Sequence, residues 1–286
     1  MSDSDHDDFG GLQRDLVATG VAINRRGVLR LGARFGAAIG AFQLIGCSDS
    51  PTSPTPTTTT TSTSTNTTTT TTTPPTSTAT CSKIPEETAG PYPGDGSNGP
   101  TVLTSAGVVR GDIRSSFAGM SGSAAGVPLN VVLTIVSAST CAPLAGAAVY
   151  IWQCDREGRY SLYTQGVTNQ NYLRGVQEAD ASGRVTFQSI YPGCYAGRWP
   201  HIHFEVYPTL AAATNVRNKT ATSQIALPKS ANDVVYATAG YEASVRNAAQ
   251  VTLASDNVFR DGSALELATT MGDVTNGFTA TLTVAI

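Results

Sequence analysis

The pattern of hydrophobic and polar positions changes along this chain of 286 residues. From residue 81 onward, short runs rich in β-branched and aromatic residues alternate with Gly, Pro, Asn and Asp, which is typical of strands joined by turns. The best helical candidate, NDVVYATAGYEASV (232–245), is short. We therefore expect residues 81–286 to form one all-β domain, a β-sandwich. Its expected strands are VPLNVVLTIVSA (127–138), AAVYIWQC (147–154), GRVTFQSIYP (183–192), HIHFEVYP (201–208) and GFTATLTVAI (277–286).

Residues 1–47 have a different pattern, in which Arg25 and Arg26 precede a moderately apolar stretch that ends in LIGC at Cys47. This arrangement resembles a twin-arginine export signal followed by a lipoprotein cleavage box. The stretch is short and contains Arg34, whereas a permanent membrane span needs about 20 apolar residues. We expect a leader that is removed on export. Cys47 then either becomes a lipidated first residue, the one membrane attachment that the sequence suggests, or stays without lipid.

Residues 48–80 follow this region, and residues 51–80 consist almost entirely of Thr, Ser and Pro. Such a segment cannot bury apolar surface, so we expect a disordered linker. In a polyproline-like conformation of roughly 3.1 Å per residue, it would reach on the order of 90 Å. The sequence leaves open whether the linker is glycosylated.

Charge and composition narrow the class of protein further. Only 14% of the residues are charged and the formal net charge is -3, so nothing suggests binding to nucleic acid. The abundance of Gly, Thr, Ser and Ala suits a β-rich protein outside the cytoplasm. We expect an exported protein of the cell envelope or the extracytoplasmic space.

Two of the three histidines, His201 and His203, lie in one expected strand. Residues two apart in a strand project to the same face, so both side chains can reach one metal ion. Glu205 follows on that face, and the three would suggest an iron(II) triad or a cupin-like site. The first and last of these positions are, however, about 13 Å apart, too far for one ion to bind all three readily. Further ligands must come from elsewhere in the chain.

Tyr160 and Tyr195 are the candidates for these further ligands. Tyr195 lies six positions before His201, and Tyr160 follows the expected strand 147–154. Free phenols have a pKa near 10, so only a strongly Lewis-acidic ion such as iron(III) would keep two of them deprotonated. Spacing alone favours ordinary core or rim tyrosines.

Three stretches resemble the intradiol ring-cleavage dioxygenases, the family of catechol and protocatechuate dioxygenases. They are EETAGPYP (86–93), PLAGAAVYIWQCDREGRY (143–160) and GRVTFQSIYPGCYAGRWPHIHFEVY (183–207). In that family, two tyrosines and two histidines bind non-haem iron(III). The resemblance implies that the same ion is the cofactor here, with Tyr160, Tyr195, His201 and His203 as its ligands.

The resemblance also assigns roles to three other residues. Arg198 matches an arginine beside the bound aromatic ring, where a permanent cation can stabilise negative charge on the substrate. Gln224 resembles a glutamine near that ring, although its neighbours depart from the aromatic residues usual there. Tyr92 resembles a residue of the segment that closes over the substrate. Taken alone, Arg198 would be read as a surface ion-pair partner and Tyr92 as a turn aromatic.

The implied reaction joins a catechol-type substrate with O₂. By resemblance, Tyr195 leaves the iron when the catechol binds and takes up a proton, while Tyr160 stays. The ring then opens between its two hydroxylated carbons to give a muconate-type dicarboxylic acid. The chain lacks the helical dimerisation region of many soluble relatives, so it is similar to exported, single-domain members of the family. Which catechol it uses, and whether it forms a homodimer, stay open.

Four cysteines of the expected domain, Cys81, Cys141, Cys154 and Cys194, form an even set that suits an exported protein. Three connectivities are open. We favour Cys154 with Cys194, since each lies close to a candidate tyrosine ligand, and Cys81 with Cys141.

Two other functions remain open. One is a secreted, prealbumin-like sandwich that binds a ligand or a surface without catalysis. The other is a cupin-like iron(II) or zinc enzyme. Colour separates them from the first hypothesis, because tyrosinate bound to iron(III) gives a burgundy protein.

Overall fold

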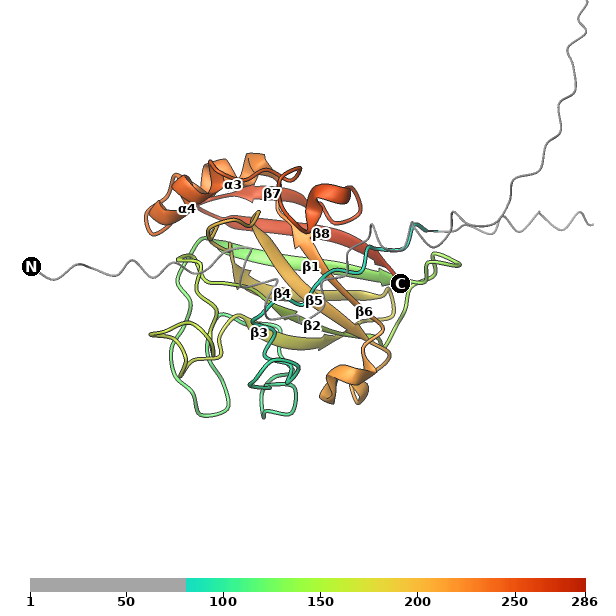
Figure 1. Cartoon of the computed structure of the whole chain (residues 1–286). Coiled ribbons are helices and arrows are strands. Elements are labelled where there is room, and N and C mark those ends of the chain that lie inside the picture. Colours follow the sequence, from blue (N-terminus) through green and yellow to red (C-terminus); the bar gives the residue numbers. More distant parts are fainter. Residues whose placement is uncertain (1–80) are drawn as a thin grey trace, which may run out of the picture. The chain divides into compact units, whose positions relative to one another are not determined.

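The computed structural model describes residues 81–286 (Figure 1). The expected leader (1–47), with Arg25, Arg26 and Cys47, and the expected linker (48–80) lie outside the described residues. Within 81–286, two four-stranded sheets form a β-sandwich, with strand orders β4-β1-β8-β7 and β3-β2-β5-β6. The predicted fold class is confirmed.

All neighbouring strands are antiparallel except β1 and β8, which are parallel. The first sheet contains β1 (Pro128–Val136), β4 (Arg184–Ile190), β7 (Thr269–Asp273) and β8 (Gly277–Ala285). The second contains β2 (Ala148–Trp152), β3 (Arg174–Glu178), β5 (His201–Tyr207) and β6 (Ala221–Ala226). The hydrophobic pattern predicts β1, β2, β4, β5 and β8, but not β3, β6 and β7.

The predicted helix 232–245 is two short helices, α3 (Lys229–Tyr236) and α4 (Glu242–Ala248). Gly240 separates them with a φ of +92°, a left-handed conformation that ends helical structure. Single 3₁₀ turns complete the structure: η1 (Ala212–Thr214), η2 (Val216–Asn218) and η3 (Phe259–Asp261).

The main hydrophobic core lies between the two sheets. Alternate residues of β5, namely Ile202, Phe204 and Val206, point into it, so the residues between them face the other side of the sheet. That other side is also covered, because Tyr150 and Trp152 of β2 pack in a second cluster with Val102, Leu103 and Val108. The sheet β3-β2-β5-β6 is therefore buried on both faces, and polar side chains of β5 lie under the chain segment that precedes β1.

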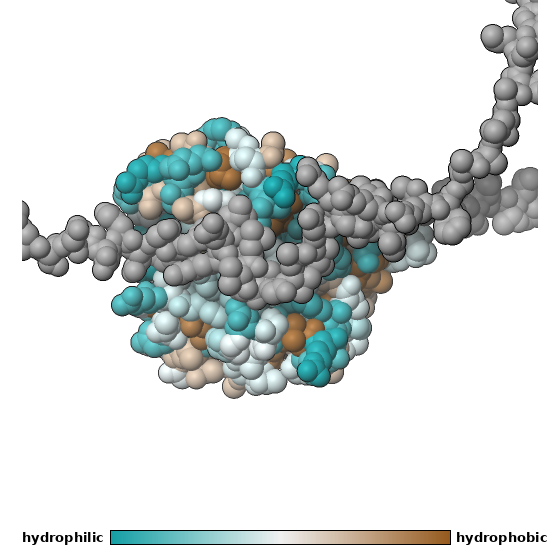
Figure 2. All heavy atoms as spheres, in the orientation of Figure 1, coloured by the Kyte–Doolittle hydropathy of each residue, from teal (hydrophilic) through white to brown (hydrophobic). Residues whose placement is uncertain are grey.

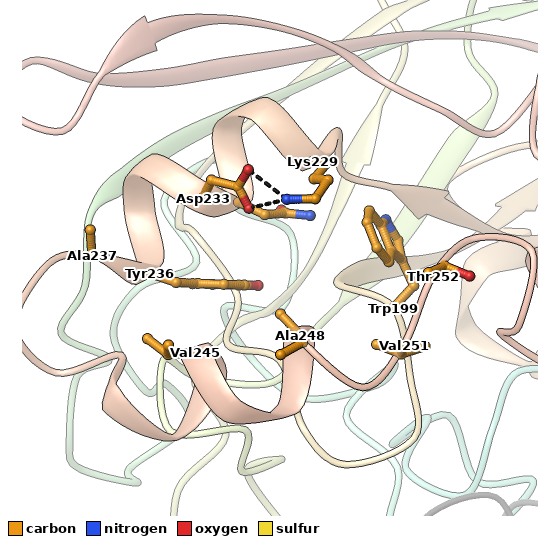
Figure 3. A pocket seen from close by; sticks show the side chains of 11 residues that line it. Trp199, Lys229, Asp233, Tyr236, Ala237, Val245, Ala248, Val251 and Thr252 are labelled. Atoms are coloured by element: carbon orange, nitrogen blue, oxygen red, sulfur yellow. Dashed lines mark hydrogen bonds and ion pairs between the residues drawn. The ribbon is translucent and has the colours of Figure 1, made fainter.

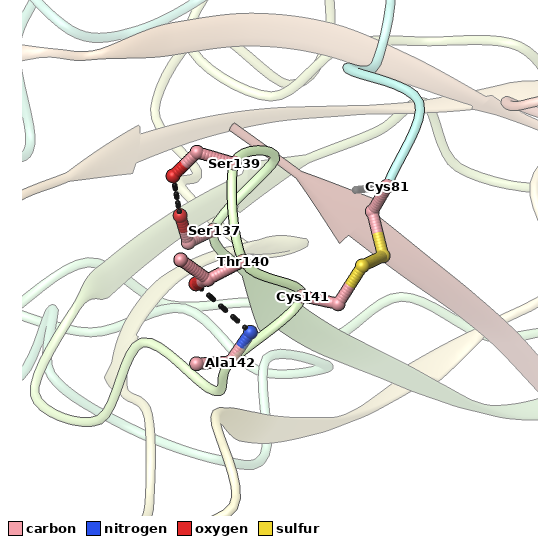
Figure 4. The surroundings of a disulfide bond; sticks show 6 residues. All are labelled: Cys81, Ser137, Ser139, Thr140, Cys141 and Ala142. Carbon is pink, nitrogen blue, oxygen red and sulfur yellow. Dashed lines mark hydrogen bonds between the residues drawn. A yellow bond between two sulfur atoms is a disulfide. The ribbon is translucent and has the colours of Figure 1, made fainter. Parts of the chain in front are cut away.

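A disulfide joins Cys81 to Cys141 and ties the beginning of the described domain to the turn after β1 (Figure 4). The other expected disulfide is wrong, since Cys154 and Cys194 are buried free thiols. Each thiol instead faces a backbone carbonyl. The Sγ of Cys154 lies 3.5 Å from the Gly193 oxygen, and that of Cys194 lies 3.4 Å from the Arg198 oxygen.

The surface of the domain mixes residue types. In Figure 2, hydrophilic and hydrophobic residues alternate over the part of the visible face that grey atoms do not cover. Large exposed hydrophobic residues come from separate elements, for example Met271 of β7 and Val245 of α4. Among residues 81–286, no helix has the length and apolar character needed to cross a membrane.

Candidate active site

Four polar atoms from three chain segments meet on the outer face of the sheet β3-β2-β5-β6. The Nε2 of His201 lies 3.1 Å from the Nε2 of His203, 3.4 Å from the phenol oxygen of Tyr160 and 3.3 Å from that of Tyr195. The structure thus brings together the four residues that the sequence analysis proposed as metal ligands.

β5 fixes both histidines, since it lies between β2 and β6. The Nδ1 of His201 is 2.6 Å from the carbonyl oxygen of Trp199. A carbonyl only accepts hydrogen bonds, so Nδ1 carries the proton. The lone pair of Nε2 therefore points toward the other three candidate metal-ligand atoms. The ring of Trp152 lies on that of His203, 4.9 Å away and 3° from parallel. Gly90 passes close above, and a Cβ there would lie 3.3 Å from the Cε1 of His203.

Tyr160 stands at the end of a tight turn after β2. The carboxylate of Asp155 accepts hydrogen bonds from the backbone N–H groups of Glu157 and Arg159. Gly158 has a φ of +83°, and a Cβ there would lie 3.0 Å from the Cβ of Tyr195. The turn therefore needs glycine at this position to let the two tyrosine segments approach each other.

α4 holds the segment that carries Tyr195. The backbone N–H of Cys194 donates to the hydroxyl of Ser244, and Asn247 donates to the Cys194 carbonyl. Tyr160 is 2% exposed. Tyr195 is half-buried and is followed by exposed residues. The two tyrosines therefore differ in their freedom to move.

Burial sets the protonation state of the four donors. It lowers the pKa of His201 and of His203 well below the ordinary value, and the nearby positive charge of Arg198 acts in the same direction. Both imidazoles are therefore neutral near pH 7, as metal ligation requires. Burial raises the pKa of Tyr160 well above its ordinary value, with Tyr195 adding to the rise and Arg198 opposing it. Without a strong cation beside it, the Tyr160 phenol keeps its proton.

This donor set suits one kind of ion. In the described part of the chain, no group of three or more His, Cys, Asp or Glu side chains could hold a metal ion, so a site here depends on the phenol oxygens. Two phenol oxygens with two imidazoles fit a hard trivalent ion such as iron(III). Zinc sites usually use thiolates, imidazoles and carboxylates.

Glu205 does not belong to this group. Its carboxylate accepts hydrogen bonds from Tyr207, at 2.6 Å, and from Lys219, at 2.7 Å. The alternative iron(II) triad of His201, His203 and Glu205 is therefore not formed. The reason is the rise along a strand, which carries the third position away from the other two.

Arg198 and Gln224 lie together in the interior. Arg198 is 1% exposed. Its Nη2 donates to the side-chain oxygen of Gln224 at 2.7 Å, and its Nε donates to Asp256 at 3.0 Å. Gln224 lies on β6 directly opposite His203. The interpretation of Arg198 as a surface ion-pair partner is therefore wrong.

Tyr92 packs beside the candidate ligands. Its ring centroid is 5.0 Å from that of Tyr160 and 5.3 Å from that of Tyr163. Tyr92 therefore lies next to one candidate ligand, and its role as a substrate-wall residue stays a prediction.

Comparison with known proteins shows which family the chain is similar to. A family model described as Dioxygenase matches residues 98–215, a range that contains all four donor residues. An intradiol ring-cleavage dioxygenase from Tetranychus urticae has a similar structure, with 26% identity and a TM-score of 0.58 over 72% of this chain and 95% of that chain. The chain is therefore similar, in sequence and in structure, to the intradiol ring-cleavage dioxygenases.

A second similar structure is that of the dioxygenase Tetur07g02040, with 28% identity and a TM-score of 0.57 over 72% of this chain and 94% of that chain. No curated protein sequence matches the chain. The similarity to intradiol dioxygenases supports cleavage of catechol-type rings as the general activity. Tyr92 and Gln224 lie outside the matched range 98–215.

Sequence reasoning missed three residues that shape this candidate site: Trp152, Arg174 and Asp256. Arg174 is fully buried and donates to the backbone carbonyls of Tyr92, Pro93 and Ser161. A signal for it existed, because a lone arginine between apolar residues in NYLRGV needs buried partners. No comparable signal links Asp256 to Arg198, since 58 positions separate them.

A separate hollow of about 470 Å³ lies between α3 and α4 of the dioxygenase domain, with Trp199 and Tyr236 in its wall (Figure 3). None of the four donor residues lines it. Its buried polar groups already have partners within the protein, because Asn232 accepts from Tyr191 and Tyr236 donates to Pro192. The charged residues that line the hollow, Lys229 and Asp233, form an ion pair with each other, and its other walls are mostly apolar.

Proposed function

We propose that this intradiol dioxygenase uses non-haem iron(III) and O₂ to open catechol-type rings between the two hydroxylated carbons, giving muconate-type dicarboxylic acids. The observation that carries the proposal is the convergence of two phenol oxygens and the Nε2 of His203 on the Nε2 of His201, each within 3.4 Å of it. Tyr160, Tyr195, His201 and His203 would hold the ion. When bound, iron(III) would supply the Lewis acidity that keeps phenols and catechol deprotonated.

The different burial of the two tyrosines supports a division of labour between them. Tyr160 is enclosed, so its phenolate would stay in place throughout the reaction. Tyr195 is half-buried and followed by the exposed residues Ala196 and Gly197. It can therefore swing away when a catechol arrives and accept one of the substrate's protons at its phenol oxygen.

Arg198, Gln224 and Tyr92 would bind and orient the substrate. A guanidinium held in a dry site acts on a catecholate more strongly than one in water, because little solvent screens it. Gln224 fixes one side of that guanidinium. The ring of Tyr92, whose centroid lies 5.0 Å from that of Tyr160, offers a flat apolar wall for an aromatic ring.

The proposal is tested by following O₂ uptake and the ultraviolet absorption of the product when iron-loaded protein meets a panel of catechols. We expect one O₂ consumed per ring opened and a muconate-type product. Tyr160→Phe should abolish turnover, whereas Tyr236→Phe, a buried tyrosine on α3, should keep it. Turnover by Tyr160→Phe at the wild-type rate would refute the ligand assignment.

We also propose that the protein is exported by the twin-arginine route, with a lipid on Cys47 as its membrane attachment. The disulfide between Cys81 and Cys141 supports this, because disulfides persist mainly in oxidising compartments. Replacing Arg25 and Arg26 together by Lys should leave the protein in the cytoplasm on cell fractionation. An unchanged extracytoplasmic location would contradict the route. Mass spectrometry of the mature N-terminus tests the lipid.

A further inference from the structure

Asp256 is a fully buried carboxylate whose two oxygens accept hydrogen bonds from four donors. One oxygen, Oδ2, accepts from the Nε of Arg198 at 3.0 Å and from the backbone N–H of Trp199 at 2.7 Å. The other, Oδ1, accepts from the backbone N–H groups of Val258 and Phe259 at 2.8 and 3.2 Å. A buried charge with this set of partners is fully compensated.

The chain segment around Asp256 makes its carboxylate a fixed point. The backbone N–H of Asp256 donates to the Thr252 carbonyl, and its own carbonyl accepts from Arg260. Oδ1 is held at the beginning of η3, by N–H groups that would otherwise lack partners. Arg198, in contrast, has a long side chain with many rotamers. The immobile Asp256 carboxylate stabilises one of these rotamers.

Two connections run from Oδ2 into the site. Through Arg198, the first reaches Gln224 at 2.7 Å, and Gln224 in turn donates to the Thr88 carbonyl at 2.8 Å. The second runs along the backbone of Trp199 to His201, whose Nδ1 donates to the Trp199 carbonyl at 2.6 Å. One carboxylate oxygen therefore contacts both the substrate-side guanidinium and the backbone N–H of Trp199, the residue whose carbonyl orients a candidate ligand.

We propose that Asp256 is a positioning residue of this dioxygenase, which aims the Arg198 guanidinium at the catechol and orients His201 through the backbone of Trp199. This inference rests on the proposed function. The Asp256 carboxylate accepts hydrogen bonds from Arg198 and from backbone N–H groups, and from none of the four candidate ligand side chains. Outer partners of this kind typically change affinity or activity by about 10–100-fold when they are replaced.

The test uses iron-loaded Asp256→Asn, with Asp233→Asn on the exposed face of α3 as matched control. Anaerobic optical titration measures the dissociation constant for catechol, and O₂ uptake measures turnover. We expect Asp256→Asn to keep its iron but to bind catechol and turn over about 10–100-fold less well, while Asp233→Asn behaves as wild type. Wild-type affinity and turnover in Asp256→Asn would overturn the inference.

A double-mutant cycle separates positioning from a merely structural role. If Asp256 acts mainly through Arg198, adding Asp256→Asn to Arg198→Ala should cost less than about threefold further in catechol affinity. An undiminished further loss would contradict action through Arg198. Asp256→Glu, which keeps the charge but displaces it, should also bind catechol less tightly, and it serves if the amide variant does not fold.

A crystal structure of the iron-loaded variant gives a readout that is independent of turnover. We expect the Arg198 side chain of Asp256→Asn to have left Gln224. If wild-type protein neither binds catechol nor consumes O₂, the proposed function fails. A guanidinium that stays on Gln224 in Asp256→Asn shows that the positioning inference fails by itself.

Discussion

The indole of Trp152 lies flat on the imidazole of His203, with ring centroids 4.9 Å apart and planes 3° from parallel. The two residues are register partners on β2 and β5. The candidate ligand is thus fixed by a ring from the neighbouring strand as well as by its own backbone.

We predict that Trp152→Ala lowers the free energy of unfolding by about 3–5 kcal/mol, because it leaves a large cavity in the second hydrophobic cluster, and that it weakens iron retention. Trp152→Phe should do far less. The indole Nε1 has no hydrogen-bond partner among the described residues, so phenylalanine removes no polar contact. Thermal unfolding and iron content after dialysis measure both effects. Equal iron loss in the two variants would contradict a role for the stacked ring.

Arg198→Ala should keep iron and lose turnover, because none of the four donor atoms comes from Arg198. We expect turnover to fall by about 100-fold or more, as for other groups that stabilise developing charge. Arg246→Ala, at an exposed position of α4, is the control. Iron content distinguishes a role in turnover from a structural role, since loss of iron from Arg198→Ala would show that the arginine is structural.

Arg174→Ala should loosen the segment that carries Tyr92. The guanidinium donates to the Tyr92, Pro93 and Ser161 carbonyls. The Pro93 carbonyl would keep its hydrogen bond from the Tyr150 hydroxyl, but leaving the other two buried acceptors unpaired costs on the order of 3 kcal/mol. We expect faster proteolysis near residues 90–100 and a lower unfolding temperature. Arg184→Ala, at an exposed position of β4, should change neither.

Glu266 should make stability depend on pH. Burial raises its pKa from 4.5 to about 8, helped by the negative charges of Glu87, Asp261 and Asp256 and opposed by a hydrogen bond from Ser223. The folded state therefore holds this proton between pH 4.5 and 8, where the unfolded state has released it. Its contribution to stability is present below pH 4.5 and is lost as the pH rises toward 8.

Urea unfolding at pH 5 and pH 8 measures this effect. Glu266→Gln should lose less stability than wild type between the two values, because the amide cannot titrate. Glu178→Gln, at an exposed position of β3, should retain the full wild-type dependence. Identical pH dependence of wild type and Glu266→Gln would show that Glu266 does not hold the proton.

Local sequence pattern was sufficient for part of the fold. In β1, β5 and β8, hydrophobic residues either alternate with polar ones or follow one another over seven to nine residues. Such patterns predict strands from the sequence alone. β3, with the sequence RGVQE, contains only one large hydrophobic residue, and β7, TTMGD, is largely exposed at a sheet edge. These two are strands because their neighbours pair with them, which no local pattern records.

The candidate site divides in the same way. The spacing of His201 and His203 predicts their shared face, because strand geometry fixes it. The meeting of Tyr160 with Tyr195 was accessible only through the family resemblance, since it depends on how two turns pack at Gly158. The contact between Asp256 and Arg198 joins positions far apart in the chain through tertiary packing, so neither spacing nor motif could indicate it.

Iron analysis combined with visible absorption of the purified protein tests the central claim most directly. We predict about one ferric ion per chain and a broad visible band from phenolate bound to iron(III), which shifts when catechol is added without O₂ and is lost in Tyr160→Phe. A colourless protein after loading with iron, or a visible band that Tyr160→Phe leaves unchanged, would contradict the claim.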